Sequence, residues 1–278
     1  MIEIIKDTLI DSVKLLPFLF ITYLIMEYIE HKTSDKAKKV MKKSGKFGPI
    51  IGGILGIFPQ CGFSAAASNL YAGRIISVGT LIAVYLSTSD EMLPILISEA
   101  VDIKVIAQIL LIKVVVAMIA GVIIDLVFSK INKEKKENYE IDHICEDDHC
   151  HCEKGGIVKS AVHHTLNIFI YIVIITLIAN IIIHFIGEEN IASAILNNKI
   201  MGPIIAGLIG LIPNCASSVI LTNLYLTGML GMPTLIAGLL VGSGVGAIVL
   251  FRVNKNIKEN ITILGILYLI GVIVGIII

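Results

Sequence analysis

The sequence contains a long internal repeat. Residues 48–86 align with residues 202–240 without a gap, and 17 of the 39 aligned positions are identical. Each copy interrupts an apolar run with a proline, an amide and a cysteine, Pro59-Gln60-Cys61 and Pro213-Asn214-Cys215. Identity at a constant offset over this length indicates a duplicated structural unit. The chain is therefore expected to fold as two related halves.

The composition is that of a membrane protein. Hydrophobic residues make up 56% of the chain and charged residues 16%, and the mean hydropathy is +0.90. A water-soluble globule of this length needs more polar surface than this. The formal net charge is zero and the charges gather in a few short segments, so a nucleic-acid partner is not expected. We expect a multi-pass protein of the cell inner membrane whose partner is the lipid bilayer.

Apolar runs indicate which segments cross the bilayer. Residues 9–29, 105–128, 165–186 and 261–278 each have the roughly 20 apolar residues that a crossing needs. The first run has no small-residue cleavage site after it and is expected to be retained. Residues 48–98 number only 51, whereas three full crossings would take about 60. Shortened, broken or re-entrant helices are expected in this segment and in its repeat.

Lysine placement predicts the orientation of the halves. Seven lysines lie in residues 32–46, whereas the equivalent loop, residues 188–199, contains one. Because cytoplasmic loops are enriched in lysine and arginine, these equivalent loops are expected on opposite sides. Each half then contains an odd number of crossings, three or five, and the halves are inverted repeats. The repeat extends toward the C-terminus, where Gly121 is paired with Gly271 after a four-residue shift.

The predicted fold class is thus an all-α integral membrane protein with two inverted-topology repeats. About ten transmembrane or half-membrane helices are expected, with broken or re-entrant helices in each repeat. The boundaries are residues 1–128 for the first repeat, 129–159 for a cytoplasmic linker, and 160–278 for the second repeat.

The two proline breaks are the first candidate site. A proline removes a backbone donor and disturbs the helix, so the exposed backbone must face protein or a wet cavity. The alternative is that these polar side chains only hold helices together. Candidate substrate-binding residues at the breaks are Gln60, Cys61, Ser64, Asn214, Cys215 and Ser218, with Asn69 and Asn223 in second rank.

A second pair of equivalent segments differs in charge. Ser87-Thr88-Ser89-Asp90-Glu91 in the first half corresponds to Val241-Gly242-Ser243-Gly244-Val245 in the second. Carboxylates within a membrane are costly, so Asp90 and Glu91 are candidate cation ligands or proton carriers, together with Ser89 and Ser243. The alternative places both acids in water at the external end of a helix. Lys113, Asp125 and Arg74 are candidate counter-charges.

The linker carries a separate metal-binding signal. Six imidazole or thiol groups lie within ten residues, enough to bind a zinc-like ion. The alternative, a solvated flexible loop, is compatible with metal capture. No permanently bound cofactor is expected elsewhere. The candidate ligands of this accessory loop are His143, Cys145, His149, Cys150, His151 and Cys152.

Longer motifs carry a resemblance to a known family. FPQCGFS, SNLYA, GTLIAV and LSTSDEMLP occur in the first half, and IPNCASS, LTNLYL and GSGVG in the second. These segments resemble the bacterial ten-span heavy-metal exporters, a family also named as arsenic efflux permeases or manganese transporters. The resemblance covers the chain apart from the linker, and it implies ten crossings, five per half.

Three substrate classes follow from the candidate residues. A manganese-like divalent cation prefers carboxylate, amide and hydroxyl oxygen, and is placed slightly ahead of arsenite, which prefers thiolates. The alternative is a permease for an organic or anionic solute, with the metal loop regulatory. No GxxxxGK[ST] motif is present, so transport is expected to use an ion or voltage gradient. No arrangement of residues within an apolar run suggests an enzyme.

Overall fold

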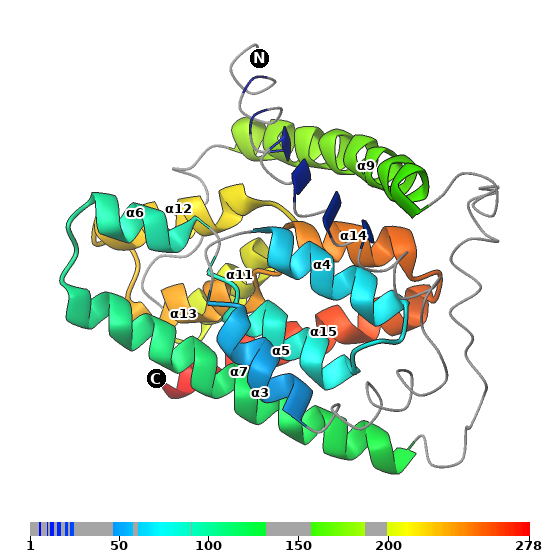
Figure 1. Cartoon of the computed structure of the whole chain (residues 1–278). Coiled ribbons are helices and arrows are strands. Elements are labelled where there is room, and N and C mark those ends of the chain that lie inside the picture. Colours follow the sequence, from blue (N-terminus) through cyan, green and yellow to red (C-terminus); the bar gives the residue numbers. More distant parts are fainter. Residues whose placement is uncertain are drawn as a thin grey trace.

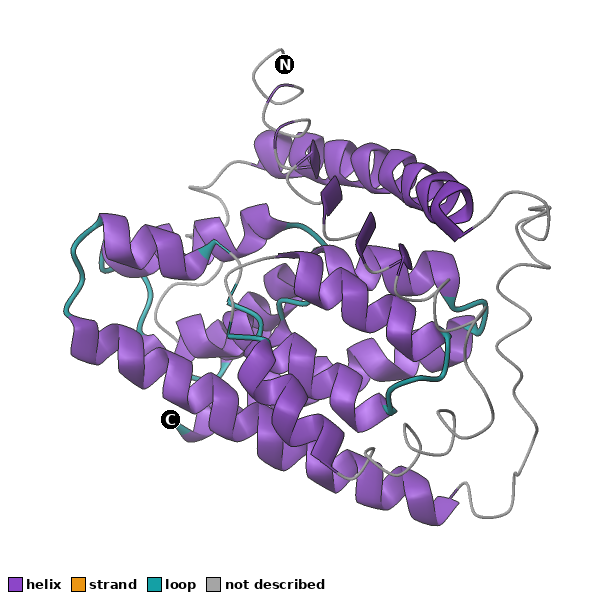
Figure 2. Ribbon diagram, viewed as in Figure 1, coloured by secondary structure: helices purple, strands orange, loops and turns teal. Residues whose placement is uncertain are grey.

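The described part of the chain is helical. The computed structural model describes residues 47–57, 61–89, 91–131, 157–186 and 199–278, together with isolated positions between Lys6 and Leu24. No strand occurs among these residues (Figure 2). The helices are α3 (Gly48–Leu55), α4 (Cys61–Ala72), α5 (Val78–Ser87), α6 (Met92–Ser98), α7 (Ile103–Ile131), α9 (Ile157–Ile186), α11 (Met201–Gly210), α12 (Cys215–Leu226), α13 (Met232–Val241), α14 (Val245–Val253) and α15 (Ile257–Ile277).

The helices of the two halves begin at equivalent positions. In α4 and α12 the first residues are 154 positions apart (215 − 61 = 154). The same separation holds for α5 and α13 (232 − 78 = 154) and for α7 and α15 (257 − 103 = 154). The duplicated sequence has therefore folded into the same series of elements twice.

Helix length separates elements that can cross a bilayer from those that cannot. Five apolar stretches are long enough to cross: Val78–Ser98, Ile103–Phe128, Ala161–Ile178, Met232–Val253 and Ile257–Ile277. In contrast, α4 and α12 have 12 residues each. At 1.5 Å per residue such a helix is about 18 Å long, well short of the roughly 30 Å of hydrocarbon. The still shorter α3 and α11 cannot cross alone either.

Two of these five stretches form the centre of the molecule. Val78–Ser98 is 71% buried and Met232–Val253 is 83% buried, whereas the other three are 28%, 29% and 33% buried. Both central stretches are broken in the middle, between α5 and α6 and between α13 and α14. The outer helices expose apolar side chains such as Leu111 and Ile119. Such a face suits lipid rather than water.

The packing partners recur in the two halves. In the first half α5 packs against α3 and α7, and in the second α13 packs against α11 and α15. Between the halves, α4 packs against α14 and α12 packs against α6 (Figure 1). Each helix that follows a proline break thus packs on the second part of the other half's broken stretch.

Three glycines of α3 and its C-cap, Gly48, Gly52 and Gly56, permit close contact with α5. A Cβ atom at these positions would meet side chains of α5 within ordinary contact distance or closer. The partners on α5 are Thr80, Val84 and Ser87. These small residues therefore serve helix packing.

The alignment of α15 with α7 differs from the alignment expected from the sequence. A Cβ atom at Gly121 would meet three residues of its own half, and a Cβ atom at Gly275 would meet their counterparts 154 positions later. The partners are Pro49, Gly79 and Ala83 for Gly121, and Pro203, Pro233 and Ala237 for Gly275. Gly275, not Gly271, is therefore the structural equivalent of Gly121. The four-residue shift was wrong because similar apolar letters align equally well in several registers.

Candidate functional site

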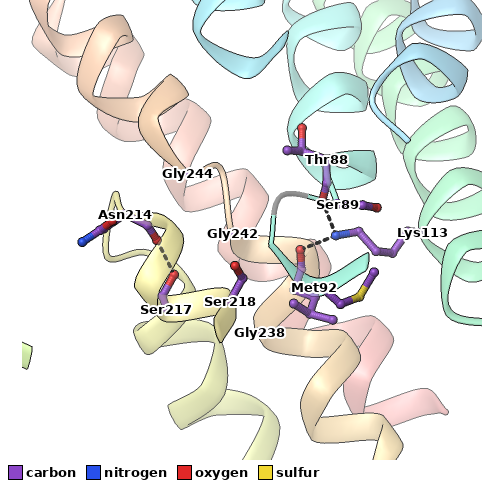
Figure 3. Close-up of a pocket in the computed structure, with 11 residues that line it drawn as sticks. Thr88, Ser89, Met92, Lys113, Asn214, Ser217, Ser218, Gly238, Gly242 and Gly244 are labelled. Atoms are coloured by element: carbon purple, nitrogen blue, oxygen red, sulfur yellow. Dashed lines mark hydrogen bonds between the residues drawn. The ribbon is translucent and has the colours of Figure 1, made fainter. Parts of the chain in front are cut away.

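A small cavity lies where the two broken central stretches meet α7 and α12. Residues of both halves line it (Figure 3). The first half contributes Thr88, Ser89, Met92 and Lys113, and the second half contributes Asn214, Ser217, Ser218, Gly238, Leu239, Gly242 and Gly244. The interruption between α5 and α6 and the interruption between α13 and α14 thus open onto the same cavity.

Lys113 places a positive charge in the lining of this cavity. The side chain is 1% exposed and comes from the middle of α7. Its Nζ donates hydrogen bonds to the carbonyl oxygens of Thr88, at 2.5 Å, and Leu239, at 2.8 Å (Figure 3). Thr88 is the C-cap of α5, and Leu239 lies in the last turn of α13. Carbonyls at helix C-termini have no partner within their helix, so the ammonium satisfies one from each half.

Amide and hydroxyl groups at the start of α12 form another side of the cavity. Asn214 is the N-cap of α12, and its Oδ1 accepts a hydrogen bond from the Ala216 N–H at 3.4 Å. The Ser217 hydroxyl donates to the Asn214 carbonyl at 2.8 Å, and the Ser218 hydroxyl donates to the Cys215 carbonyl at 2.8 Å. Asn214 and Ser217 are both buried. This side therefore offers oxygen atoms that can accept or donate at short range.

The break between α13 and α14 depends on glycine. Gly244 has φ 53° and ψ −141°, a conformation that side-chain-bearing residues rarely adopt. The preceding Gly242 ends α13, where its N–H donates to the Gly238 carbonyl at 3.0 Å. Both glycines line the cavity.

A hydroxyl cluster joins α4, α5 and α14 beside the cavity. The Ser68 Oγ lies 2.7 Å from the Tyr85 hydroxyl and donates to the Gly246 carbonyl at 2.7 Å. Tyr85 also donates to that carbonyl, at 3.0 Å. All three groups are buried, so the cluster fixes α4 of the first half to α14 of the second.

The family described as "Putative, 10TM heavy-metal exporter" matches residues 1–188 of this 278-residue chain. The chain belongs to this family. No curated protein and no solved structure matches the chain. The match confirms the family that the motifs indicated, and it covers the first-half motifs but ends before those of the second half. An exporter family is not a class of enzymes.

In this member of the heavy-metal exporter family, three of the predicted site residues meet at the cavity. They are Ser89, from the interruption between α5 and α6, and Asn214 and Ser218, from the start of α12. Ser243 lies in the second break and is 1% exposed. Its hydroxyl has no hydrogen-bond partner within the described residues.

Other predicted residues lie away from the cavity lining. Cys215 is 8% exposed and packs in an apolar cluster with Ala65 of α4 and residues of α14. Ser64 is buried in the contact between α4 and Gly246. Glu91 is the partly buried N-cap of α6. Their role as ligands stays a prediction.

The two second-rank asparagines differ in environment although their sequences align. Asn69 is 1% exposed, and its Oδ1 accepts a hydrogen bond from the Tyr23 hydroxyl at 3.0 Å. Its Nδ2 has no partner among the residues that the structure describes. Asn223 is exposed on α12. The repeat therefore does not give the two positions the same surroundings.

Several predicted residues lie outside the part of the chain that the structure describes. They are Gln60, Asp90 and the linker residues His143, Cys145, His149, Cys150, His151 and Cys152, together with the side chain of Cys61. Within the described ranges, no group of three His, Cys, Asp or Glu residues is close enough to hold a metal ion.

Two predicted counter-charges have partners away from the cavity. Arg74 donates to both carboxylate oxygens of Glu259, at 2.8 and 3.1 Å. Asp125 accepts from the Ser77 hydroxyl at 2.6 Å and from the Gly79 N–H at 2.8 Å, at the start of α5. Neither residue lines the cavity.

The sequence interpretation underestimated Lys113 and missed Ser217 and Thr88. Lys113 was expected only as a counter-charge, yet it reaches the backbone of both halves. A charged residue in the middle of an apolar run is a strong sequence signal for function in a membrane. No comparable signal distinguished Thr88 or Ser217 from the other hydroxyl residues.

Proposed function

We propose that the chain is a secondary-type exporter of a heavy-metal species, and that the cavity is its transport site. The family description supports export. The observation that carries the site is that one cavity is lined by both helix breaks and by both halves. Many secondary transporters bind substrate near the bilayer midplane, where discontinuous helices of two repeats meet.

Contacts at the two ends of α15 support an inverted arrangement of the halves. Arg74, just before α5, pairs with Glu259 in the first turn of α15. Gly275, near the end of α15, packs against Pro203 and Pro233 at the starts of α11 and α13. The broken stretch of each half therefore begins at a different end of the same 21-residue helix.

Helix lengths support three full crossings and one re-entrant hairpin in each half. The proposed hairpins are α3 with α4 and α11 with α12, since none of these helices is long enough to cross. The proposed crossings are the first apolar run, α5 with α6, and α7, then α9, α13 with α14, and α15. Four hairpin arms and six crossings add up to ten apolar segments, the same number as the ten transmembrane segments in the family name, although only six of them cross in this proposal. Of the two odd counts that the lysines allow, we propose three.

Lysine and arginine placement supports the sidedness. The seven lysines of residues 32–46 precede α3, and Arg252, Lys255 and Lys258 lie around the start of α15. The Arg74 turn is at this same end. We propose that this end faces the cytoplasm of a cell whose inner membrane holds the protein.

The substrate candidates remain a manganese-like divalent ion and arsenite, with an anionic or organic solute as the alternative. The cavity side chains are hydroxyls, an amide, a thioether and an ammonium. As metal ligands, hydroxyl and amide oxygens suit the divalent ion better than arsenite, whereas Lys113 favours a species that tolerates a fixed positive charge. The His- and Cys-rich linker would serve as an accessory metal-capture segment.

Purified protein in vesicles tests the proposal with arsenite, manganese and zinc as probes. Asn214→Ser keeps an N-cap oxygen for α12 but shortens the side chain in the cavity. Thr227→Ser, at the exposed C-cap of the same helix, is the control. We expect flux of at least one probe, a reduction of about tenfold with Asn214→Ser, and no change with the control. Absence of flux for all three probes, or equal flux in both variants, would overturn the proposal.

A further inference from the structure

Lys113 occupies a position where a transported cation would otherwise find its strongest ligands. Its ammonium lies between the C-terminal end of α5 and the last turn of α13, one broken helix from each half. Helix C-termini carry partial negative charge, and backbone carbonyls there are typical cation ligands in broken-helix transporters. The lysine therefore takes one carbonyl from each of the two broken stretches.

The lysine also breaks the symmetry of the repeat. At the separation of 154 positions, the counterpart of Lys113 is Leu267 of α15. Leu267 is fully buried and belongs to the apolar core around α5 and α13. A residue retained by packing alone would be apolar in both halves. Instead, a charge that is costly in a membrane is present on one side only, in contact with both breaks.

The other described residues that line the cavity are uncharged. Ser217, Ser218 and Asn214 present hydroxyl and amide groups, and among the described lining residues there is no carboxylate. Asp90 belongs to the first break but lies outside the described residues. Lys113 is thus the charged group among the described lining residues. A bare divalent cation would meet a like charge at this side of the cavity.

We propose that Lys113 is a resident cation that sets the charge class of the substrate. The transported heavy-element species carries its own oxygen atoms, as an uncharged hydroxide or an oxyanion, and these oxygens face the positive charge of Lys113. Bare divalent cations are excluded because the ammonium already occupies the two carbonyls. This inference rests on the proposed function and names the substrate class of the same site.

Selectivity of flux in vesicles tests the role of Lys113. The probes are arsenite, which is an uncharged hydroxide near neutral pH, selenite, which is an oxyanion, and the cations manganese and zinc. Lys113→Met removes the charge, and Lys113→Gln removes it but keeps an N–H donor for a carbonyl. Lys104→Met, an exposed lysine on the same helix, is the matched control.

We expect wild type and the Lys104 control to carry arsenite or selenite and neither cation. Both Lys113 variants should lose this flux by about tenfold or more, the effect of one charge-assisted hydrogen bond. They should also gain measurable manganese or zinc binding, which a merely structural role would not produce. The Gln variant keeps the test decisive if the Met variant does not fold.

Two outcomes separate this inference from the proposed function. If wild type carries manganese or zinc and the Lys113 variants carry it equally well, the resident-cation role is wrong while export through the cavity stands. If wild type carries none of the four probes, both proposals fail together. Selenite flux without arsenite flux, or the reverse, identifies the oxyanion or the hydroxide as the transported form.

Discussion

At Gly246, the absence of a side chain brings two halves of the molecule into contact. A Cβ atom there would lie 2.7 Å from the Ser64 Cβ and 2.8 Å from the Tyr85 Cε1. The Gly246 carbonyl accepts hydrogen bonds from Ser68 and Tyr85. Gly246 therefore leaves space for Ser64 of α4, and its carbonyl accepts a hydrogen bond from Ser68 of α4. Both features hold α4 against α14.

We predict that Gly246→Ala destabilises the protein by about 1–3 kcal/mol, the usual cost of overpacking a tight core. Thermal unfolding in detergent measures the effect. Gly265→Ala is the matched control, because no atom lies within 4 Å of its added Cβ on α15. Alanine there should leave the melting temperature unchanged or slightly raised. Equal melting temperatures for the two variants would contradict the close contact between α4 and α14.

The sequence predicted three of the residues that line the cavity. Asn214 and Ser218 were found because they lie at a proline break that leaves backbone unsatisfied. Ser89 was found because it lies beside two carboxylates in an apolar region. Cys215 shares that location along the chain, yet it packs among Ala65, Val245 and Ile248. A break restricts where polar groups occur, but the rotation of α12 decides which of its side chains face the cavity. That rotation depends on packing with other helices.

At the scale of the element, the segment between α13 and α14 has a defined non-helical conformation. Gly244 adopts a positive φ with an extended ψ, and α14 begins directly after it. In the first half an interruption of residues 88–91 separates α5 from α6 and contains no glycine. The two breaks therefore have equivalent positions but different backbone requirements.

We predict that Gly244→Ala strains this break by about 1–3 kcal/mol, because a Cβ is disfavoured in that backbone conformation. The cavity loses its shape, so flux should fall more than the melting temperature suggests. Gly228→Asn is the control, since Gly228 also has a positive φ, 76°, but has open space around it. Asparagine tolerates that left-handed conformation. Normal flux in Gly244→Ala would show that the break does not need this geometry.

Element lengths explain why the sequence left the number of crossings open. Residues 48–98 were too few for three ordinary crossings, which correctly predicted shortened helices in this region. Periodicity cannot show whether two short apolar helices form a hairpin or two steep crossings, because both bury apolar residues all round. Length decides this only when the bounds of α4 and α12 are known.

At the scale of the whole molecule, membrane character and duplication were predictable because both depend on long stretches of sequence. The all-α class and the family membership agree with the expectation. The contacts of α4 with α14 and of α12 with α6 were not predictable, since they join segments of different halves. They arise when each half lacks enough partners of its own to cover its short helices.

The proposed inverted topology predicts which side of the membrane each turn faces. Ile75 and Met229 occupy equivalent turns, 154 positions apart, each just before a broken stretch. The proposed topology places Ile75 inside and Met229 outside, because the two stretches begin at opposite ends of α15. Lys255, in the loop before α15, should be inside.

Single cysteines at these three positions test the arrangement in a background without the five native cysteines. A membrane-impermeant maleimide should label Met229→Cys in intact cells, and Ile75→Cys and Lys255→Cys only after permeabilisation. Retained flux in the cysteine-free background shows that the fold is intact. Labelling of Ile75→Cys and Met229→Cys from the same side would mean parallel halves. The two breaks would then have no reason to meet at the midplane, and the transport site proposed at the cavity would have to be abandoned.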